Sequence, residues 1–543
     1  MQLYLGPLLR YTGSTQATVW VETDAACTVE VLGRRARTFQ VAGHHYALVV
    51  LADLEPGSVT SYTVSLDGEP VWPPADGRPP SVIRTREHER QARLAFGSCR
   101  VGAPQHPPYT LAPGDHPEGY GVDALWAFSR RLQAGREPWP DCLLLLGDQV
   151  YADEVSPATR EFLRARRDVS QPPEDEVADF EEYTRLYRES WSDPDIRWLL
   201  ATVPSTMIFD DHDVHDDWNI SEAWVREARE LPWWEERILG AFTAYYVYQH
   251  LGNLAPPELE QERLFHDVLA VDDASELLRR FARTADRETT ASRFAFHRDF
   301  GRTRLVVIDS RAARVLADGR RDMVDAEEWD WIVEHVRGAY DHLIVASTLP
   351  VFMAEAIHYL EAFDEAVAGG AWGRLAVCPA EKLRRALDLE HWPAFQRSFV
   401  TLVELLREVA AGTGGEPPAS ITLIGGDVHT AYVAEVDLGP RQVSRVYQVV
   451  CSPFRNPLAP REQRVIRLMR TRVMGLLMRG LARAAGVRRS DVRWRFLTEP
   501  TFDNSIALLE LDERAASVVI RRSEPEGDDG PPLTTLHEQQ LAP

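Results

Sequence analysis

The pattern of hydrophobic and polar positions changes near residue 80 and divides the chain into two parts. In the first 85 residues, apolar and polar side chains alternate in short runs such as 17–23 and 61–66, as in half-buried strands. A proline-rich connector follows at residues 73–80. Beyond it, short apolar runs alternate with longer amphipathic stretches, which is typical of an α/β domain. The pattern predicts a small β-sandwich at 1–85 and an α/β domain at 90–521.

Several segments refine this division. Leu-Glu-Pro-Gly at 54–57 precedes Tyr62, as in the tyrosine corner of immunoglobulin-like and fibronectin-type sandwiches, where the tyrosine hydroxyl binds an upstream turn. Residues 522–543 are rich in proline, glycine and acidic side chains, so we expect a flexible tail. Helical insertions in the α/β domain are predicted near 155–200, 219–290, 355–418 and 456–495.

Ionisable residues follow four of the predicted buried strands. The segments are Gly-Ser-Cys-Arg at 97–100, Gly-Asp-Gln-Val-Tyr at 147–151, Asp-Asp-His-Asp at 210–213 and Gly-Gly-Asp-Val-His at 425–429. The sheets of α/β proteins bind ligands at the carboxyl ends of their strands, and thiolates, imidazoles and carboxylates are common metal ligands. Each segment alone is a weak signal, because Cys99 could be a small core residue and 210–213 an acidic surface loop. Together they predict a metal site.

Composition limits the classes of partner. The net charge of −23 and the isoelectric point near 5.2 argue against a nucleic-acid-binding domain, although bound metals or local arginines still attract phosphate. Five cysteines without C-x-x-C spacing favour a reducing compartment. The sequence shows neither a signal peptide nor an apolar run of transmembrane length, so we expect cytoplasmic residence. The oligomeric state stays open.

The four segments resemble the motifs of the calcineurin-like metallophosphoesterases, and more closely those of the PhoD-like alkaline phosphatases. The variant motifs of that family, G-S-C, G-D-x-x-Y, D-D-H-D/E and G-D-x-H, occur here in order between residues 97 and 429, and residues 309–314 match its D-x-R-x-x-R segment. The resemblance implies an αββα sandwich of mixed sheets flanked by helices, preceded by a small all-β immunoglobulin-like sandwich. It also implies a metal-dependent phosphoric ester hydrolase.

Carried over position by position, the resemblance assigns two groups of metal ligands. One ion would be held by Cys99, Asp148, Tyr151 and His429. Asp148 would bridge to a second ion, which Asp211 and Asp427 would also hold. Thiolate, phenolate and imidazole donors suit Fe³⁺, whereas carboxylate oxygens suit Ca²⁺, Mg²⁺ or Mn²⁺.

The implied reaction is the hydrolysis of phosphomonoesters, phosphodiesters or both. Two ions about 3.5–4 Å apart would share a hydroxide that attacks phosphorus, and His212 would protonate the leaving group or stabilise its charge. Asp213 or Asp216 would orient this imidazole; the alternative is that His212 is a buried histidine satisfied by its acidic neighbours. Ser347 and Thr348 stand where other metallophosphoesterases carry a further histidine.

Arginines complete the predicted pocket. Arg100 directly follows Cys99, and Arg311 and Arg314 lie in the D-x-R-x-x-R segment. A guanidinium group matches the geometry of phosphate oxygens, so Arg100 and Arg311 are predicted to bind the substrate. The alternative for Arg311 and Arg314 is a buried ion pair with Asp309.

Two further hypotheses remain open from the sequence. The basic stretch 461–489 carries Val, Leu and Met between its arginines, and such a helix either lies on a membrane, approaches a phosphorylated substrate, or pairs with the acidic body of its own chain. The alternative to an enzyme is a metal-binding interaction protein with a vestigial phosphoesterase site.

Overall fold

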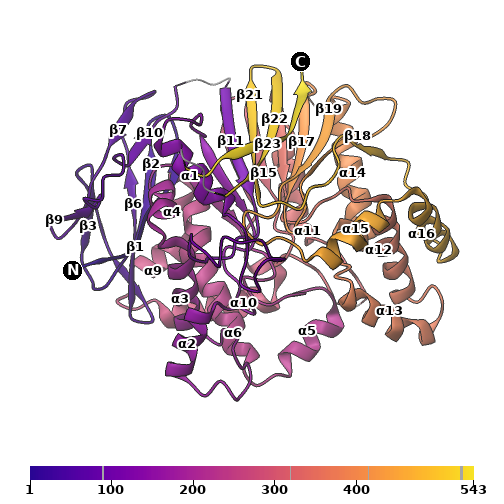
Figure 1. Ribbon diagram of the computed structural model, residues 1–543, viewed down its shortest axis with the longest axis horizontal. Coiled ribbons are helices and arrows are strands. Elements are labelled where there is room, and N and C mark those ends of the chain that lie inside the picture. The colour runs from indigo at the N-terminus through magenta and orange to yellow at the C-terminus, as the bar shows by residue number, and fades with distance from the viewer. Residues whose placement is uncertain (88–90, 318, 414, 526–529) are drawn as a thin grey trace.

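The N-terminal part of the chain is a β-sandwich, which lies at the left of the computed structural model in Figure 1. The structure describes residues 1–87, 91–317, 319–413, 415–525 and 530–543. One four-stranded antiparallel sheet consists of β1 (Leu3–Thr12), β2 (Ala17–Thr23), β6 (His44–Leu51) and β5 (Phe39–Val41). The other consists of β4 (Arg34–Arg37), β3 (Thr28–Val31), β8 (Val64–Leu66) and β9 (Glu69–Trp72), and β7 (Val59–Ser61) pairs with β10 (Val82–Arg84).

Two larger mixed sheets form the centre of the molecule. The six-stranded sheet has the order β13 (Ser205–Ile208), β12 (Cys142–Leu146), β11 (Gln91–Gly97), β21 (Ser505–Asp512), β22 (Ala515–Ser523) and β23 (Leu533–Ala542). The seven-stranded sheet has the order β14 (Phe296–Phe300), β15 (Thr303–Val307), β16 (His342–Ala346), β17 (Ser420–Gly425), β19 (Arg445–Val450), β18 (Tyr432–Asp437) and β20 (Arg493–Phe496). Strands β11–β13 are parallel, as are β15, β16, β17 and β19.

The two central sheets pack face to face because their strands are apolar on both sides. Successive side chains of a strand point to opposite faces. In β12, Leu143 and Leu145 join the core beneath the helices, whereas Leu144 and Leu146 join the core shared with Ile344 of the other sheet. Strands buried on both faces read as continuous apolar runs, as β12 does. The αββα sandwich implied by the resemblance is therefore confirmed.

Helices cover the outer faces of the two sheets. On the six-stranded side lie α1 (Ala124–Gln133), α2 (Pro157–Arg166), α3 (Phe180–Trp191), α4 (Pro194–Leu200), α5 (Glu222–Arg229), α6 (Trp234–Ala244), α7 (Leu251–Asn253), α8 (Pro256–Leu259), α9 (Arg263–Leu269) and α10 (Ser275–Arg287). On the other side lie α11 (Ala326–Val336), α12 (Glu355–Ala368), α13 (Arg374–Ala386) and α14 (Gln396–Ala410), followed by α15 (Pro460–Met469) and α16 (Arg472–Ala484). No helix among the described residues is long and apolar enough to cross a membrane.

Two sequence-based predictions are wrong: the flexible tail at residues 522–543 and the contact of Tyr62 with its upstream turn. Residues 533–542 of the predicted flexible tail form β23, which pairs along β22 and covers its outer edge; residues 526–529 of that tail lie outside the described part of the chain. Tyr62 does not bind its own upstream turn. Its hydroxyl donates to the carbonyl of Ala201, at the end of α4, so it joins the β-sandwich to the α/β domain.

Arg10 makes a second connection between these two parts. Its side chain is fully buried and donates to the carbonyls of Tyr248 and Gln249 at 2.6 and 2.8 Å, and to that of Ser205 at 3.1 Å. Buried carbonyls that receive a charged donor stabilise the contact, because neither partner is left without a hydrogen bond. The sandwich is thereby fixed beside β13, whose carboxyl end leads into the candidate site.

Candidate metal centre

The donor residues lie where the parallel strands end, and their backbone is strained there. Cys99, Asp148, Asp427 and His429 all have positive φ angles, at 56°, 47°, 64° and 46°. Non-glycine residues adopt this left-handed region rarely, and each such residue costs on the order of 1–3 kcal/mol. Strain of this kind persists where it aims side chains at a functional point. Four strained donors in one place therefore mark a site.

Glycines allow the strand ends to approach one another. Gly147 has a φ of 96°, and a Cβ there would clash with the carboxylate of Asp210. A Cβ on Gly426 would likewise overlap the side chain of Ser98. The glycines of the sequence motifs thus remove bulk where β11, β12, β13 and β17 converge.

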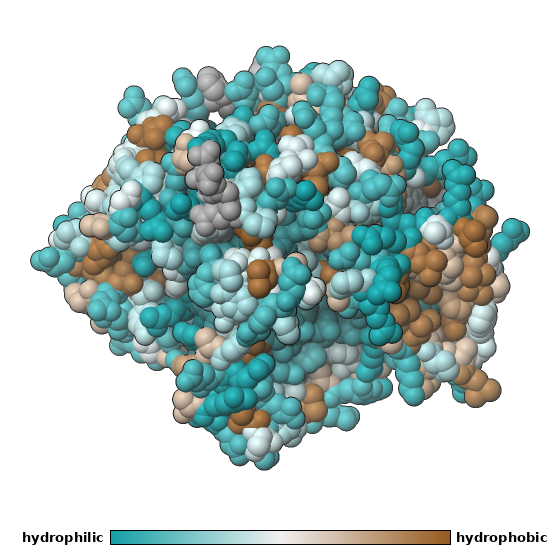
Figure 2. Space-filling model, viewed as in Figure 1, coloured by the Kyte–Doolittle hydropathy of each residue, from teal (hydrophilic) through white to brown (hydrophobic). Residues whose placement is uncertain are grey.

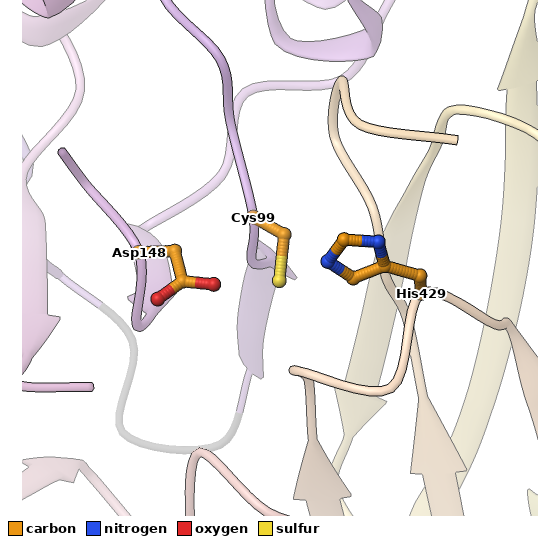
Figure 3. A group of neighbouring side chains, drawn as sticks. All are labelled: Cys99, Asp148 and His429. Carbon is orange, nitrogen blue, oxygen red and sulfur yellow. The ribbon is translucent and has the colours of Figure 1, made fainter. Parts of the chain in front are cut away.

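The first donor group comprises Cys99, Asp148 and His429, whose ligand atoms lie within 4.8 Å of one another. In Figure 3 the thiol of Cys99 lies between the other two side chains, and all three point toward a common space. Burial raises the pKa of Cys99, and burial lowers the pKa of His429 to about 4. A neutral imidazole is the form that binds a metal, and a metal would displace the thiol proton.

Tyr151 lies close enough to this group for the charges of Asp148 and Cys99 to act on its phenol. Its side chain is 6% exposed, and its hydroxyl accepts a hydrogen bond from the amide of Asn456 at 3.1 Å. Burial, followed by the charges of Asp148 and Cys99, raises the pKa of this phenol. Only a nearby cation would make the phenolate stable here.

The second donor group comprises Asp148, Asp210, Asp211 and Asp427, again with ligand oxygens within 4.8 Å of one another. Asp148 belongs to both groups. Asp210 is absent from the ligand sets predicted from the sequence, but the structure places its carboxylate among the possible ligands. Carboxylate oxygens in this number are the donors that Ca²⁺, Mg²⁺ and Mn²⁺ prefer.

Several carboxylate oxygens of the site are buried without a hydrogen bond among the described residues. Both side-chain oxygens of Asp148 and one of Asp210 are buried without a hydrogen bond in the described part of the chain. Burial raises the pKa of Asp148 well above its ordinary value and that of Asp211 to about 7. Burying such charges is costly unless a cation compensates them. The donor set therefore fits two cations.

His212 is held at the rim of this centre, with its side chain 18% exposed. Its Nδ1 lies 2.9 Å from Oδ1 of Asp153, so the predicted orienting role of Asp213 is wrong: Asp213 instead accepts from the backbone N–H of Asp210 and the amide of Gln249. Asp216 lies 3.9 Å from Nε2. Burial alone would lower the pKa of His212, but the charge and hydrogen bond of Asp153 outweigh it and raise the pKa.

Both predicted substrate arginines are buried and hydrogen-bonded to groups of the protein itself. Arg100 is buried and donates to Asp123 at 2.8 Å and to the carbonyl of Ser190. Its neighbour Cys99 faces the metal centre, while the guanidinium of Arg100 packs beneath α1. The prediction that Arg100 binds substrate is therefore wrong.

Arg311 is fully buried beneath the second donor group. Its Nε donates to Asp210 at 2.6 Å, and its Nη2 lies 3.1 Å from Asp211 and 3.6 Å from Asp427. Glu390 receives the other end of the guanidinium and also pairs with Arg314. Arg311 thus compensates and positions carboxylates of the site, which corrects its predicted contact with substrate.

His391 is the residue that sequence reasoning missed. Its Nδ1 lies 2.7 Å from Glu361 and its Nε2 lies 3.6 Å from Asp427. It thus brings an imidazole to the centre from the 355–418 insertion. The two residues after β16 carry no thiol, imidazole or carboxylate. The hydroxyl of Ser347 accepts a hydrogen bond from the indole of Trp392, and the hydroxyl of Thr348 is hydrogen-bonded to that of Ser310. Nothing in the spacing of the motifs points to His391.

Comparisons with known proteins agree with this geometry. A family model described as PhoD-like phosphatase matches residues 126–463, and one described as Domain of unknown function (DUF7800) matches residues 1–83. No curated protein matches the chain.

Solved structures support the fold. The structure described as "Structure of PhoD" superposes with a TM-score of 0.61 at 13% sequence identity, covering 100% of this chain and 91% of the other. A maltogenic amylase from S. marinus aligns with a TM-score of only 0.17 and bears on nothing here. The family model spans more than half of the sequence. This chain belongs to the PhoD-like phosphatase family.

Proposed function

We propose that this chain hydrolyses phosphomonoesters, phosphodiesters or both, as a two-metal member of its metal-dependent phosphoesterase family. The observation that carries the proposal is Asp148, which belongs to both donor groups and whose two buried oxygens have no other partner among the described residues. A carboxylate in this position is suited to bridge two cations. We further propose Fe³⁺ for the Cys99 group, with its thiolate, phenolate and imidazole, and Ca²⁺ (or Mg²⁺ or Mn²⁺) for the carboxylate group.

The cations would polarise the phosphoryl oxygens and lower the pKa of a bound water. The protein itself holds the donors in fixed positions. Arg311 donates to Asp210, and His391 lies 3.6 Å from Asp427, so these carboxylates need little reorganisation when substrate binds. Preorganised charge of this kind is usually the largest contribution to catalysis.

His212 would act on the leaving group. The carboxylate of Asp153 lies 2.9 Å from Nδ1 of this imidazole, which fixes the ring and leaves Nε2 to act on the substrate. An imidazolium oriented in this way can donate the Nε2 proton to the departing alkoxide as the ester bond breaks. The ring of Tyr151, 4.7 Å away between centroids, limits its rotation.

The test is turnover by protein of known metal content. We expect the purified chain, loaded with iron and calcium, to release nitrophenol from nitrophenyl phosphate, from bis(nitrophenyl) phosphate, or from both. Asp148→Asn is expected to abolish turnover and to lower the content of both metals, while the circular dichroism spectrum stays unchanged. The two esters separate monoesterase from diesterase activity.

Two outcomes would count against the proposal. Wild-type protein that holds both metals but cleaves neither ester would favour the alternative, a metal-binding interaction protein with a vestigial site. Asp148→Asn protein that keeps both metals would show that this carboxylate does not bridge them.

A further inference from the structure

The helical hairpin of α15 and α16, residues 460–489, presents an apolar surface to solvent. Val473, Leu476 and Leu477 are 74%, 64% and 52% exposed, and Val465 and Leu468 are 53% and 55% exposed. Helix α15 has no buried residue, and α16 buries only Gly475 and Ala482, where it packs against α12. Helices of soluble proteins normally turn their leucines inward.

The exposed apolar side chains of α16 form a patch at the edge of the molecule. Figure 2 shows apolar residues gathered at the right, over the position that α16 occupies in Figure 1. Trp372, 48% exposed, extends the patch from the neighbouring segment and donates through its indole nitrogen to the carbonyl of Ala484. Large exposed apolar patches mark surfaces that bind a protein or a membrane.

The hairpin is also strongly basic, unlike the rest of the chain. Residues 460–489 contain nine arginines and one acidic residue, within a chain of net charge −23. The structure pairs only two of the arginines of the hairpin with carboxylates of the described residues: Arg470 with Glu499 and Arg479 with Glu355. The exposed arginines without such a partner are Arg461, Arg464, Arg467, Arg472, Arg483, Arg488 and Arg489. The hypothesis that the acidic body neutralises this stretch therefore accounts for a minority of its charge.

Charge and apolar surface are arranged side by side on α16. At 100° per residue, Arg472, Arg479 and Arg483 fall on one stripe, and Leu476, Val473 and Leu477 fall on the adjoining stripe that faces solvent. Long arginine side chains beside an apolar face keep their charge in water while their stems lie on the apolar surface. This is the arrangement of helices that lie in a membrane interface.

We propose that the α15–α16 hairpin docks the protein onto an anionic lipid bilayer. The apolar stripe would enter the boundary between headgroups and acyl chains, and the unpaired arginines would contact the anionic headgroups. A bilayer matches both halves of the surface, because it offers negative charge directly above an apolar layer. The proposal does not depend on the reaction at the metal centre.

A second copy of this chain is a poorer occupant of the patch. Most homodimers are two-fold symmetric and bring the same surface of both copies together. Such a contact would oppose the exposed arginines of one hairpin to those of the other, and like charges placed together at an interface are costly. Dimerisation through the hairpin is thus the outcome against which docking is tested.

The experiment is flotation of the full chain with lipid vesicles at low salt. We expect binding to vesicles of phosphatidylcholine with phosphatidylserine, weaker binding to phosphatidylcholine alone, and release as salt screens the arginines. Leu476→Ser/Leu477→Ser should weaken binding at least tenfold, because two leucines no longer enter the bilayer. Arg464→Gln/Arg472→Gln/Arg483→Gln should weaken binding about fivefold for each arginine.

The matched control is Val59→Ser/Val443→Ser, which removes two apolar side chains that are 55% and 68% exposed elsewhere. It should bind vesicles as the wild type does. Failure of the wild type to bind anionic vesicles at low salt would overturn the proposal. So would a vesicle-free dimer, seen by light scattering, that Leu476→Ser/Leu477→Ser converts to monomer.

Discussion

The two central sheets contribute differently to the same site. In the six-stranded sheet all three parallel strands end in possible ligands: Cys99 after β11, Asp148 after β12, and Asp210 and Asp211 after β13. In the seven-stranded sheet only β17 does so, through Asp427 and His429. That half of the molecule instead supplies Arg311, Glu390 and His391, which hold the carboxylates in place.

The comparison separates binding of cations from support of the ligands. A ligand that is replaced should affect chemistry more than folding, because the strained donors are not optimised for stability. A supporting residue that is replaced should affect folding more, since it leaves buried carboxylates without compensation. Substitutions on each side can sharpen this division or break it.

After the loss of the shared carboxylate Asp148, the largest effect is expected at His212, on the side of the six-stranded sheet. His212→Asn removes the group proposed to protonate the leaving group, so kcat should fall about 10³-fold, within the usual range for an acid catalyst. Metal content and the urea midpoint should stay near those of the wild type. The measurement is kcat on a nitrophenyl ester together with elemental analysis.

A substrate with a better leaving group provides the control for this prediction. Nitrophenolate needs less protonation than an alkoxide, so the loss caused by His212→Asn should be smaller for the nitrophenyl ester than for an alkyl phosphate. Equal losses on both substrates would assign His212 to binding or to structure.

The next largest effect is expected at Arg311, on the supporting side. Arg311→Met would leave Asp210 buried without its charged partner and Glu390 with Arg314 alone, and breaking a buried pair in this way costs about 3 kcal/mol or more. Urea unfolding of the metal-free protein measures this loss of stability. The matched control is Arg279→Met, which breaks a surface pair with Glu236 and should cost less than about 1 kcal/mol. An equal loss in the free energy of unfolding for the two variants would show that Arg311 does not support the buried carboxylates.

The sequence identifies most of the residues that the structure brings together at the strand ends, but it does not identify the residues that support them. Motifs at strand ends are local, so Cys99, Asp148 and His429 follow from reading along the chain. His391 reaches the centre only through tertiary packing, and no spacing reveals that. Arg100 is predicted to bind substrate because it follows a possible ligand, Cys99, in the sequence. Its own side chain instead donates to Asp123.

The same limit applies to the fold. Strands such as β12 are evident in the sequence as continuous runs of apolar residues, because both faces of such a strand are covered in the fold. Strand β23 is an edge strand with several exposed polar residues, so its composition resembles that of a tail. It forms a strand because it pairs with β22, and the local sequence does not reveal this pairing. Local patterns thus predict central strands better than edges.

A smaller effect on activity is expected at His391, whose Nε2 lies 3.6 Å from the carboxylate of Asp427. His391→Asn should weaken cation binding about 10–100-fold, as the loss of such a supporting partner does, while kcat at saturating metal stays within a few-fold of wild type. A titration of activity with Ca²⁺ separates the two quantities. A fall in kcat at saturating metal would place His391 with His212 and break the division.

The smallest effects concern the layers that cover the two sheets, and they depend on pH in opposite directions. On the seven-stranded side, burial lowers the pKa of His358 in α12 to about 3, below the unfolded value of about 6.5. The unfolded chain therefore binds a proton that the folded chain does not, and stability falls as pH drops below 6.5. His358→Leu should abolish a loss of about 2 kcal/mol between pH 7 and 5, measured by urea unfolding.

On the six-stranded side, His44 should do the reverse. Burial alone would lower its pKa, but hydrogen bonds to Glu181 of α3 and Glu22 of β2 outweigh burial and raise the pKa to about 9. The folded chain keeps this proton between pH 6.5 and 9, so the stabilisation is complete below pH 6.5 and is lost as pH rises through 9. Because the imidazole is partly exposed, solvent should reduce the effect to about 1 kcal/mol. His44→Gln should flatten the alkaline side of the unfolding profile and leave its acid side unchanged; a change on the acid side instead would show that the two layers do not respond separately.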